Sequence, residues 1–219
     1  MQYLKTGIGA VTGKLKEIQY TPDFSEVIKV IPDRFNVLKL EKIYASGGCF
    51  LVTRNAALKT GYFDERLERS QDYDYTLRLT LSFPMIAIPS NMGIHHTVGY
   101  EERGRFISQI KKFHALYYGT VIRKNLRNFK GVMWLMIKKE HGILLGGSLM
   151  LLGFIAIYMF GKIGAAFFCL LFFSDIFVGI AKERDILYRM YLHYLFPLLI
   201  LLGCFYTLDR RSQFKVEEV

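Results

Sequence analysis

The chain has 219 residues, of which 52% are hydrophobic, and it carries a formal net charge of +10. This length fits one domain with an appendage, and the hydrophobic content is high for a soluble domain. The three cysteines, two of them in apolar segments, argue against a disulfide framework and show no spacing typical of a metal knuckle.

The first half of the chain alternates short strands and helices. We expect a strand near Gly7–Leu15, an irregular proline-punctuated stretch, and a Gly-Gly turn leading into a strand at Cys49–Thr53. Asn55 then fits the cap of a short helix that Gly61 closes. The pattern therefore indicates an α/β unit.

A second helix is predicted over Asp72–Phe83, because apolar side chains recur at the spacing of a broad buried face. It is followed by a predicted buried strand, Met85–Pro89, and by a loop that carries His95 and His96. Asp72-Tyr73-Asp74 has the D-x-D spacing of many metal sites. At 3.6 residues per turn, however, two carboxylates two positions apart point about 200° apart and would not clamp one metal.

Residues 103–139 contain ten basic residues and no acidic one. Within them apolar residues recur every three or four positions, which predicts basic amphipathic helices at a membrane interface. Anionic lipid is favoured over nucleic acid as the partner, since the segment directly precedes apolar stretches. No nucleic-acid partner is expected.

Three apolar stretches follow, at Gly142–Phe160, Ile163–Ala181 and Tyr191–Leu208, each about long enough to cross a bilayer as a helix. We expect two or three transmembrane helices within 142–208 and a polar tail at 209–219. The basic segment before them favours the cytoplasmic face for the N-terminal domain. The predicted localisation is thus a multi-pass membrane protein.

The stretch from Ser46 to Leu79, "SGGCFLVTRNAALKTGYFDERLERSQDYDYTLRL", resembles the acceptor half of family 2 glycosyltransferases, which are inverting enzymes. The resemblance continues through His95-His96 to "FHALYYGTVIRKN", which is similar to rhamnosyltransferase-like members. It implies a fold class of α/β: a partial A-type glycosyltransferase (nucleotide-diphospho-sugar transferase) fold over residues 1–102, followed by transmembrane helices.

The resemblance places the catalytic base at Asp72. A carboxylate at a helix N-terminus is stabilised by backbone N–H groups, and an inverting transfer needs a base for the acceptor hydroxyl. A simpler interpretation is that Asp72 and Asp74 only cap the helix. Six further residues are expected to support the donor and acceptor sites: Gly47, Gly48, Asp64, Gln71, Asp74 and Arg78.

The resemblance also implies a divalent metal, Mn²⁺ or Mg²⁺, that His95 or His96 could help to bind. Because the two histidines are adjacent, only one would face the site in an extended chain, and a packed or exposed pair is the alternative.

The family's nucleotide-binding strands and metal-holding D-x-D are not found before this region, so we expect a truncated chain that is inactive alone. The predicted function is part of a membrane-anchored inverting glycosyltransferase. It would move a sugar from a nucleotide-sugar donor to a lipid-linked or cell-envelope glycan acceptor, with an N-terminal half that is separately encoded. The alternative is a non-catalytic membrane protein, either a remnant or a subunit.

Overall fold

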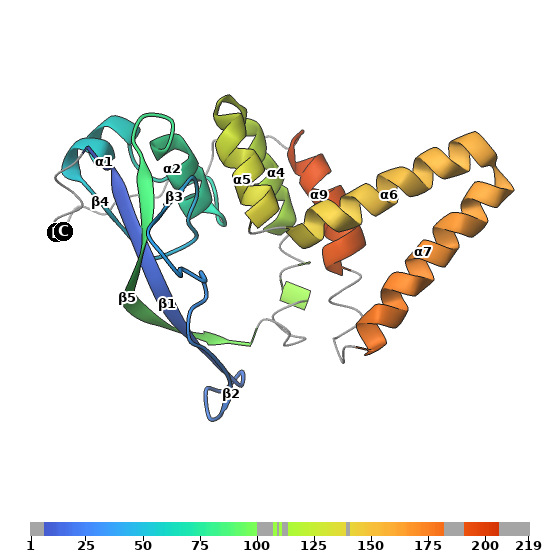
Figure 1. Cartoon of the computed structure of the whole chain (residues 1–219), viewed down its shortest axis with the longest axis horizontal. Helices are drawn as coiled ribbons and strands as arrows, with labels where there is room; N and C mark the ends of the chain where they lie inside the picture. Colours follow the sequence, from blue (N-terminus) through green and yellow to red (C-terminus); the bar gives the residue numbers. More distant parts are fainter. Residues whose placement is uncertain are drawn as a thin grey trace.

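The computed structural model describes residues 7–99, 107–108, 110, 114–138, 141–181 and 191–205. Figure 1 shows a β-sheet with two short helices at one end of the molecule and a group of longer helices beside it. The chain is α/β with a mixed sheet. The predicted tail at 209–219 lies outside the described residues, as does most of 100–113.

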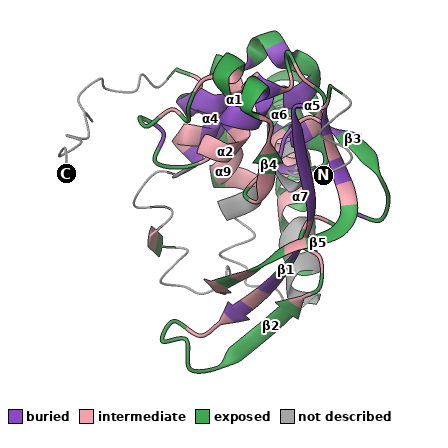
Figure 2. Ribbon diagram, turned by 90° about the vertical axis from the view of Figure 1, so that its left-hand side faces the viewer, coloured by how far each residue is buried: buried purple, intermediate pink, exposed green. Residues whose placement is uncertain are grey.

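The sheet is built on the long neighbouring strands β1 (Ala10–Tyr20) and β5 (Met85–Val98), which run parallel. β2 (Val27–Ile31) pairs with the far end of β1, and β3 (Glu41–Ile43) pairs with β5, both antiparallel. β4 (Phe50–Val52) pairs with the near end of β1. In Figure 2, β2 is exposed along its length, whereas much of β1 is buried.

The structure differs from the sequence prediction in the number and length of its strands. The stretch expected to be irregular contains β2 and β3. The expected histidine loop is the second half of β5, so His95 and His96 lie on a strand opposite Glu17 and Ile18 of β1. Pairing with β1 extends β5 past Pro89, since the ladder supplies hydrogen bonds that local sequence preference does not reveal.

Two helices lie against one end of the sheet. α1 (Arg54–Thr60) is capped by the hydroxyl of Thr53, which accepts a hydrogen bond from the Ala56 N–H, and it ends at Gly61 with φ 83°. The predicted cap, Asn55, therefore lies inside the helix. α2 (Gln71–Leu79) follows Ser70, whose φ of 61° is uncommon for a residue other than glycine.

Helix α2 is buried on two sides, as the broad apolar face predicted. Tyr75 and Leu79 pack in a core with the sheet and α1, whereas Leu77 packs in a second core with the later helices. The second core is formed by α2 together with α4 (His114–Lys124), α5 (Phe129–Lys138) and α9 (Phe196–Gly203). A 3₁₀ turn, η2 (Leu126–Asn128), joins α4 to α5.

Helices α4 and α9 cross at very short range through two glycines. A Cβ atom on Gly119 would lie 2.0 Å from the Ile200 carbonyl oxygen, and one on Gly203 would lie 2.2 Å from that of Leu116. The Thr120 hydroxyl donates to the Gly203 carbonyl at 3.2 Å. Part of the apolar face of the predicted interface helix is therefore buried within the protein, at Ala115, Tyr118 and Val121.

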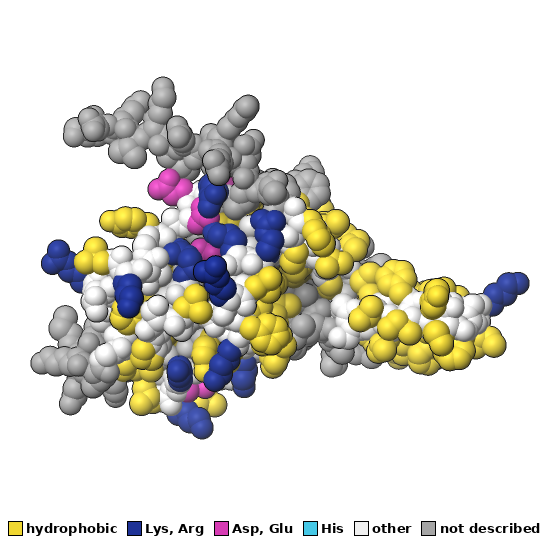
Figure 3. All heavy atoms as spheres, turned by 90° about the horizontal axis from the view of Figure 1, so that it is seen from above, with side chains coloured by type: hydrophobic (Ala, Val, Ile, Leu, Met, Phe, Trp, Pro, Cys, Tyr) yellow, Lys and Arg dark blue, Asp and Glu magenta, His cyan; other side chains and the backbone are white. Residues whose placement is uncertain are grey.

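Helices α6 (His141–Phe160) and α7 (Lys162–Ala181) form a hairpin that turns at Gly161 and projects away from the sheet (Figure 1). Figure 3 shows this arm covered with hydrophobic side chains. η3, a π-helical turn (Tyr191–Leu195), packs against α6. Large apolar side chains of the arm are exposed, among them Tyr158 at 88% and Ile163 at 77%.

The expected transmembrane helices are a point of correction. Among the residues that the structure describes, no helix combines the length and the apolar character needed to cross a bilayer. This finding overturns both the transmembrane part of the fold class and the multi-pass membrane localisation.

Candidate functional site at the start of helix α2

The site is centred on Asp72, in the first turn of α2. Its carboxylate accepts a hydrogen bond from the Tyr73 N–H at 2.9 Å. Burial raises the pKa of Asp72, while hydrogen bonds from backbone N–H groups, including those of Tyr73 and Gly48, and the positive charge of Arg34 act in the opposite direction. The carboxylate is therefore partly desolvated but surrounded by donors, which suits a group that exchanges a proton.

A surface pocket lies beside Asp72. Asp72 lines it together with residues of the preceding loop and of the helix start: Phe63, Glu68, Arg69, Ser70 and Gln71. The left-handed backbone of Ser70 turns the chain into the helix at this point. Backbone held in a sparsely populated region beside a pocket is common at functional sites. The predicted support residue Gln71 thus lines the same pocket as Asp72.

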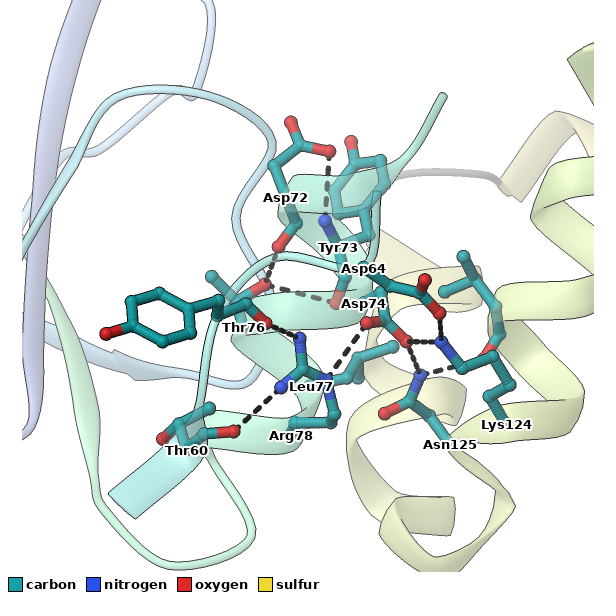
Figure 4. Close-up of polar contacts among 12 residues, drawn as sticks. Thr60, Asp64, Asp72, Tyr73, Asp74, Thr76, Leu77, Arg78, Lys124 and Asn125 are labelled. Carbon is teal, nitrogen blue, oxygen red and sulfur yellow. Dashed lines mark hydrogen bonds and ion pairs between the residues drawn. The ribbon is translucent and has the colours of Figure 1, made fainter. Parts of the chain in front are cut away.

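Asp74 has a different environment, which Figure 4 shows on the other side of α2. Its carboxylate is completely buried and forms an ion pair with Arg78 at 2.9 Å. It also accepts from the Asn125 side-chain amide at 2.9 Å and lies 3.4 Å from the Lys124 ammonium. The two carboxylates of the D-x-D diverge, and Asp74 ties α2 to the end of α4.

Asp64 and Arg78 extend this structural network. Asp64 pairs with Arg66 at 2.9 Å and with the Lys124 ammonium, so that the pKa of Asp64 is lowered. The Arg78 guanidinium donates to the carbonyls of Thr60 and Tyr62, both at 2.8 Å, and so fixes the end of α1 (Figure 4). These residues hold the helix that positions Asp72 instead of facing its pocket.

Gly47 and Gly48 shape the turn beside Asp72. A Cβ atom on Gly47 would lie 2.8 Å from the Tyr73 hydroxyl oxygen, so only glycine lets this ring pack against the turn. Gly48 has φ +113°, which side chains rarely allow, and its N–H faces the Asp72 carboxylate. Both predicted glycines therefore lie at the site.

Strand alternation separates the two histidines. His95 lies 3.2 Å from the Glu17 carboxylate and 3.5 Å from the Arg34 guanidinium. His96 instead hydrogen-bonds the Tyr20 hydroxyl at 2.9 Å and stacks on its ring. His95 thus shares its neighbour Arg34 with Asp72, and His96 does not join this group.

Sequence reasoning missed the centre of that group. Glu17 is 1% exposed and receives hydrogen bonds or ion pairs from Gln19 at 2.7 Å and Arg34 at 2.8 Å. The pKa of Glu17 is lowered because these partners, together with His95, outweigh the opposing effect of burial, which is the largest single influence. The available signal was a carboxylate on the same alternating face of β1 as Val11 and Leu15.

The described residues offer no ready metal site. Within the ranges given above, no three His, Cys, Asp or Glu side chains gather closely enough to hold a metal ion. His95 and Glu17 lie close together, but the Glu17 oxygen that faces His95 is already ion-paired with the Arg34 guanidinium. The Mn²⁺ or Mg²⁺ implied by the resemblance stays a prediction that these side chains do not support.

The comparisons with known proteins add no family to this picture. No family model, no curated protein and no solved structure matches the chain. The similarity to family 2 glycosyltransferases therefore rests on the motifs between Gly7 and Asn125.

Proposed function

We propose that this chain is part of an inverting glycosyltransferase in which Asp72 is the general base. The observation that carries the proposal is the geometry of Asp72: a partly desolvated carboxylate beside a surface pocket, at the N-terminus of a helix that a buried ionic network holds in place. The pocket would receive the acceptor hydroxyl, and the second carboxylate of the motif holds the helix.

The chemistry follows from that assignment. Asp72 takes the proton of the acceptor hydroxyl while the acceptor oxygen forms a bond to the anomeric carbon of a nucleotide-sugar. The bond from that carbon to the diphosphate breaks, and the nucleoside diphosphate leaves with the electron pair. The acceptor is a lipid-linked or cell-envelope glycan.

A cell extract tests the proposal without requiring the chain to act alone. An extract is prepared from source cells that lack the gene, and it is supplied with a panel of labelled nucleotide-sugars. Adding the wild-type chain should restore incorporation of label into lipid-linked or polymeric glycan. Asp72→Asn should lower the restored rate by roughly 10²- to 10⁴-fold, the usual contribution of a general base.

Asp23→Asn is the matched control, because Asp23 is an exposed loop carboxylate that hydrogen-bonds only its neighbours Thr21 and Ser25 in the contacts described. It should restore full incorporation. Two results contradict the proposal: equal incorporation with and without the wild-type chain, or full restoration by Asp72→Asn. The first of these favours a non-catalytic remnant or subunit.

Helix α5 supports a second contact, with anionic lipid headgroups. Phe129 and Ile137 are 64% and 53% exposed, lie on one face of the helix, and are accompanied by Lys130 and Lys138. Exposed apolar side chains between basic ones fit the surface of an anionic bilayer. Phe129→Ser with Ile137→Ser should reduce flotation of the chain with phosphatidylglycerol vesicles, whereas Leu58→Ser on α1, 69% exposed, should not.

A further inference from the structure

A second pocket lies between the sheet and helix α5, on the other side of the Ala45–Gly48 turn from the Asp72 pocket. It has a volume of about 190 Å³. Its floor is formed by residues of β1, β3 and β5, and α5 contributes Trp134 and Lys138. The loop before β3 closes the remaining side with Phe35, Asn36 and Val37.

The walls of this pocket combine aromatic rings with hydrogen-bonding groups. Phe35 and Trp134 supply flat apolar surface, and the polar groups are those of Thr12, Asn36, Glu41, Ser46 and Lys138. Trp134 is supported from behind by the Tyr44 ring, whose centroid lies 6.4 Å away. The Lys130 ammonium lies over the Tyr44 ring, 5.2 Å from its centroid, and so helps to hold Tyr44 against Trp134.

This combination favours a neutral sugar ring over an anion. A pyranose has an apolar C–H face that packs on an aromatic ring and a rim of hydroxyls that need both donors and acceptors. The pocket offers one carboxylate and one ammonium, Glu41 and Lys138, so the two formal charges cancel. A diphosphate would meet only one cation beside a carboxylate, which is a poor anion site.

The pocket is connected to the candidate base through the Gly-Gly turn. Ser46 lines the pocket, and its backbone N–H donates to the Thr76 hydroxyl of α2 at 3.1 Å. Phe35, another lining residue, lies against Gly48, whose N–H faces Asp72. A glycan bound here is therefore separated from Asp72 by a single turn of backbone.

We propose that the pocket beneath α5 binds a neutral sugar unit of the glycan acceptor, stacked on Trp134 with its hydroxyls on Glu41 and Lys138. The identity of the ligand as acceptor glycan rests on the proposed function. Binding itself does not require catalysis, so the two proposals can fail separately.

The chain provides its own probe, because Trp134 is its only tryptophan. The full-length chain is titrated with methyl glycosides of neutral hexoses and deoxyhexoses, and then with their disaccharides, while tryptophan emission is recorded. At least one glycoside should change the emission saturably, with tighter half-saturation for a disaccharide. Inorganic diphosphate at the same concentrations should leave the emission unchanged.

Two variants separate the pocket from the catalytic site. Glu41→Gln should raise the half-saturation concentration at least fivefold. Glu65→Gln should not alter it, because Glu65 lies in the α1–α2 loop outside the pocket lining. Asp72→Asn should bind as the wild type does, even if it restores no transfer. Trp134→Phe removes the signal, so its binding is followed by saturation-transfer NMR of the glycoside and should be weaker.

The proposal is overturned if no glycoside gives a saturable change, if diphosphate gives the change instead, or if Glu41→Gln titrates as the wild type does. Failure of the extract assay together with normal glycoside binding would reject the catalytic function and leave the sugar site standing.

Discussion

Replacing Asp74 by Ala tests whether the second carboxylate of the D-x-D motif stabilises the fold. The Asp74 carboxylate is fully buried and contacts Arg78 at 2.9 Å, Asn125 at 2.9 Å and Lys124 at 3.4 Å. Its loss removes the carboxylate that Arg78 and Lys124 share and one of the two acceptors of the buried Asn125 amide, which keeps the Val121 carbonyl. Removing one partner of a buried pair usually costs about 3 to 5 kcal/mol. Because Arg78 and Lys124 are each about a quarter exposed, we expect the lower end of that range.

The assay is urea denaturation followed by the emission of Trp134, whose ring packs against both hydrophobic cores. We expect Asp74→Ala to lower the free energy of unfolding by about 3 kcal/mol. Glu65→Gln, in the exposed loop between α1 and α2, should leave the midpoint unchanged. The reasoning is refuted if Asp74→Ala unfolds at the wild-type midpoint while abolishing transfer in the extract assay, since Asp74 would then serve chemistry and not structure.

Asp72→Asn should raise the free energy of unfolding by roughly 0.5 to 2 kcal/mol at neutral pH, because it removes a partly buried charge from a candidate functional site. Because burial raises the pKa of Asp72, ionisation of its carboxyl group destabilises the folded wild type as pH rises. The stability difference between Asp72→Asn and the wild type should therefore disappear in acid, and a difference that does not change with pH would contradict the burial argument. Glu17→Gln should have the reverse profile, destabilising by about 1 to 3 kcal/mol at neutral pH and less as pH falls, because the pKa of Glu17 is lowered. Gly119→Ala should lower the free energy of unfolding by about 1 to 3 kcal/mol, because the added methyl group forces α4 away from α9. Gly147→Ala should be neutral, since its Cβ would lie 3.5 Å from Pro197. Equal midpoints of the two variants in thermal unfolding would refute the close contact between α4 and α9.

The local elements of the site were accessible from the sequence. The spacing of Asp72 and Asp74 already required the two carboxylates to diverge, because helix geometry fixes the angle between them. The same periodicity predicted α2 and its buried face, although the helix ends at Leu79 and not at Phe83, and Gly61 marked the end of α1. These features depend on residues within one or two turns of each other.

The strand assignments failed where pairing at long range decided them. Pro89 argued for the end of a strand, yet β5 continues to Val98 because β1 runs beside it with a shifted register. The histidine pair consequently alternates across the sheet, and His95 alone reaches Glu17 and Arg34. The expected membrane crossings likewise rested on hydropathy alone, and no described helix meets the required length and apolar character.

The sequence by itself determined that Asp72 begins a helix, that a glycine turn precedes it, and that the chain is basic before its apolar segments. Only the tertiary structure decided which charges meet. Glu17, Arg34 and His95 are 17 to 78 positions apart, and Asp74 meets Lys124 and Asn125 across about 50. Such contacts depend on strand register and helix packing, which are set by the burial of many side chains together, so no local pattern could reveal them.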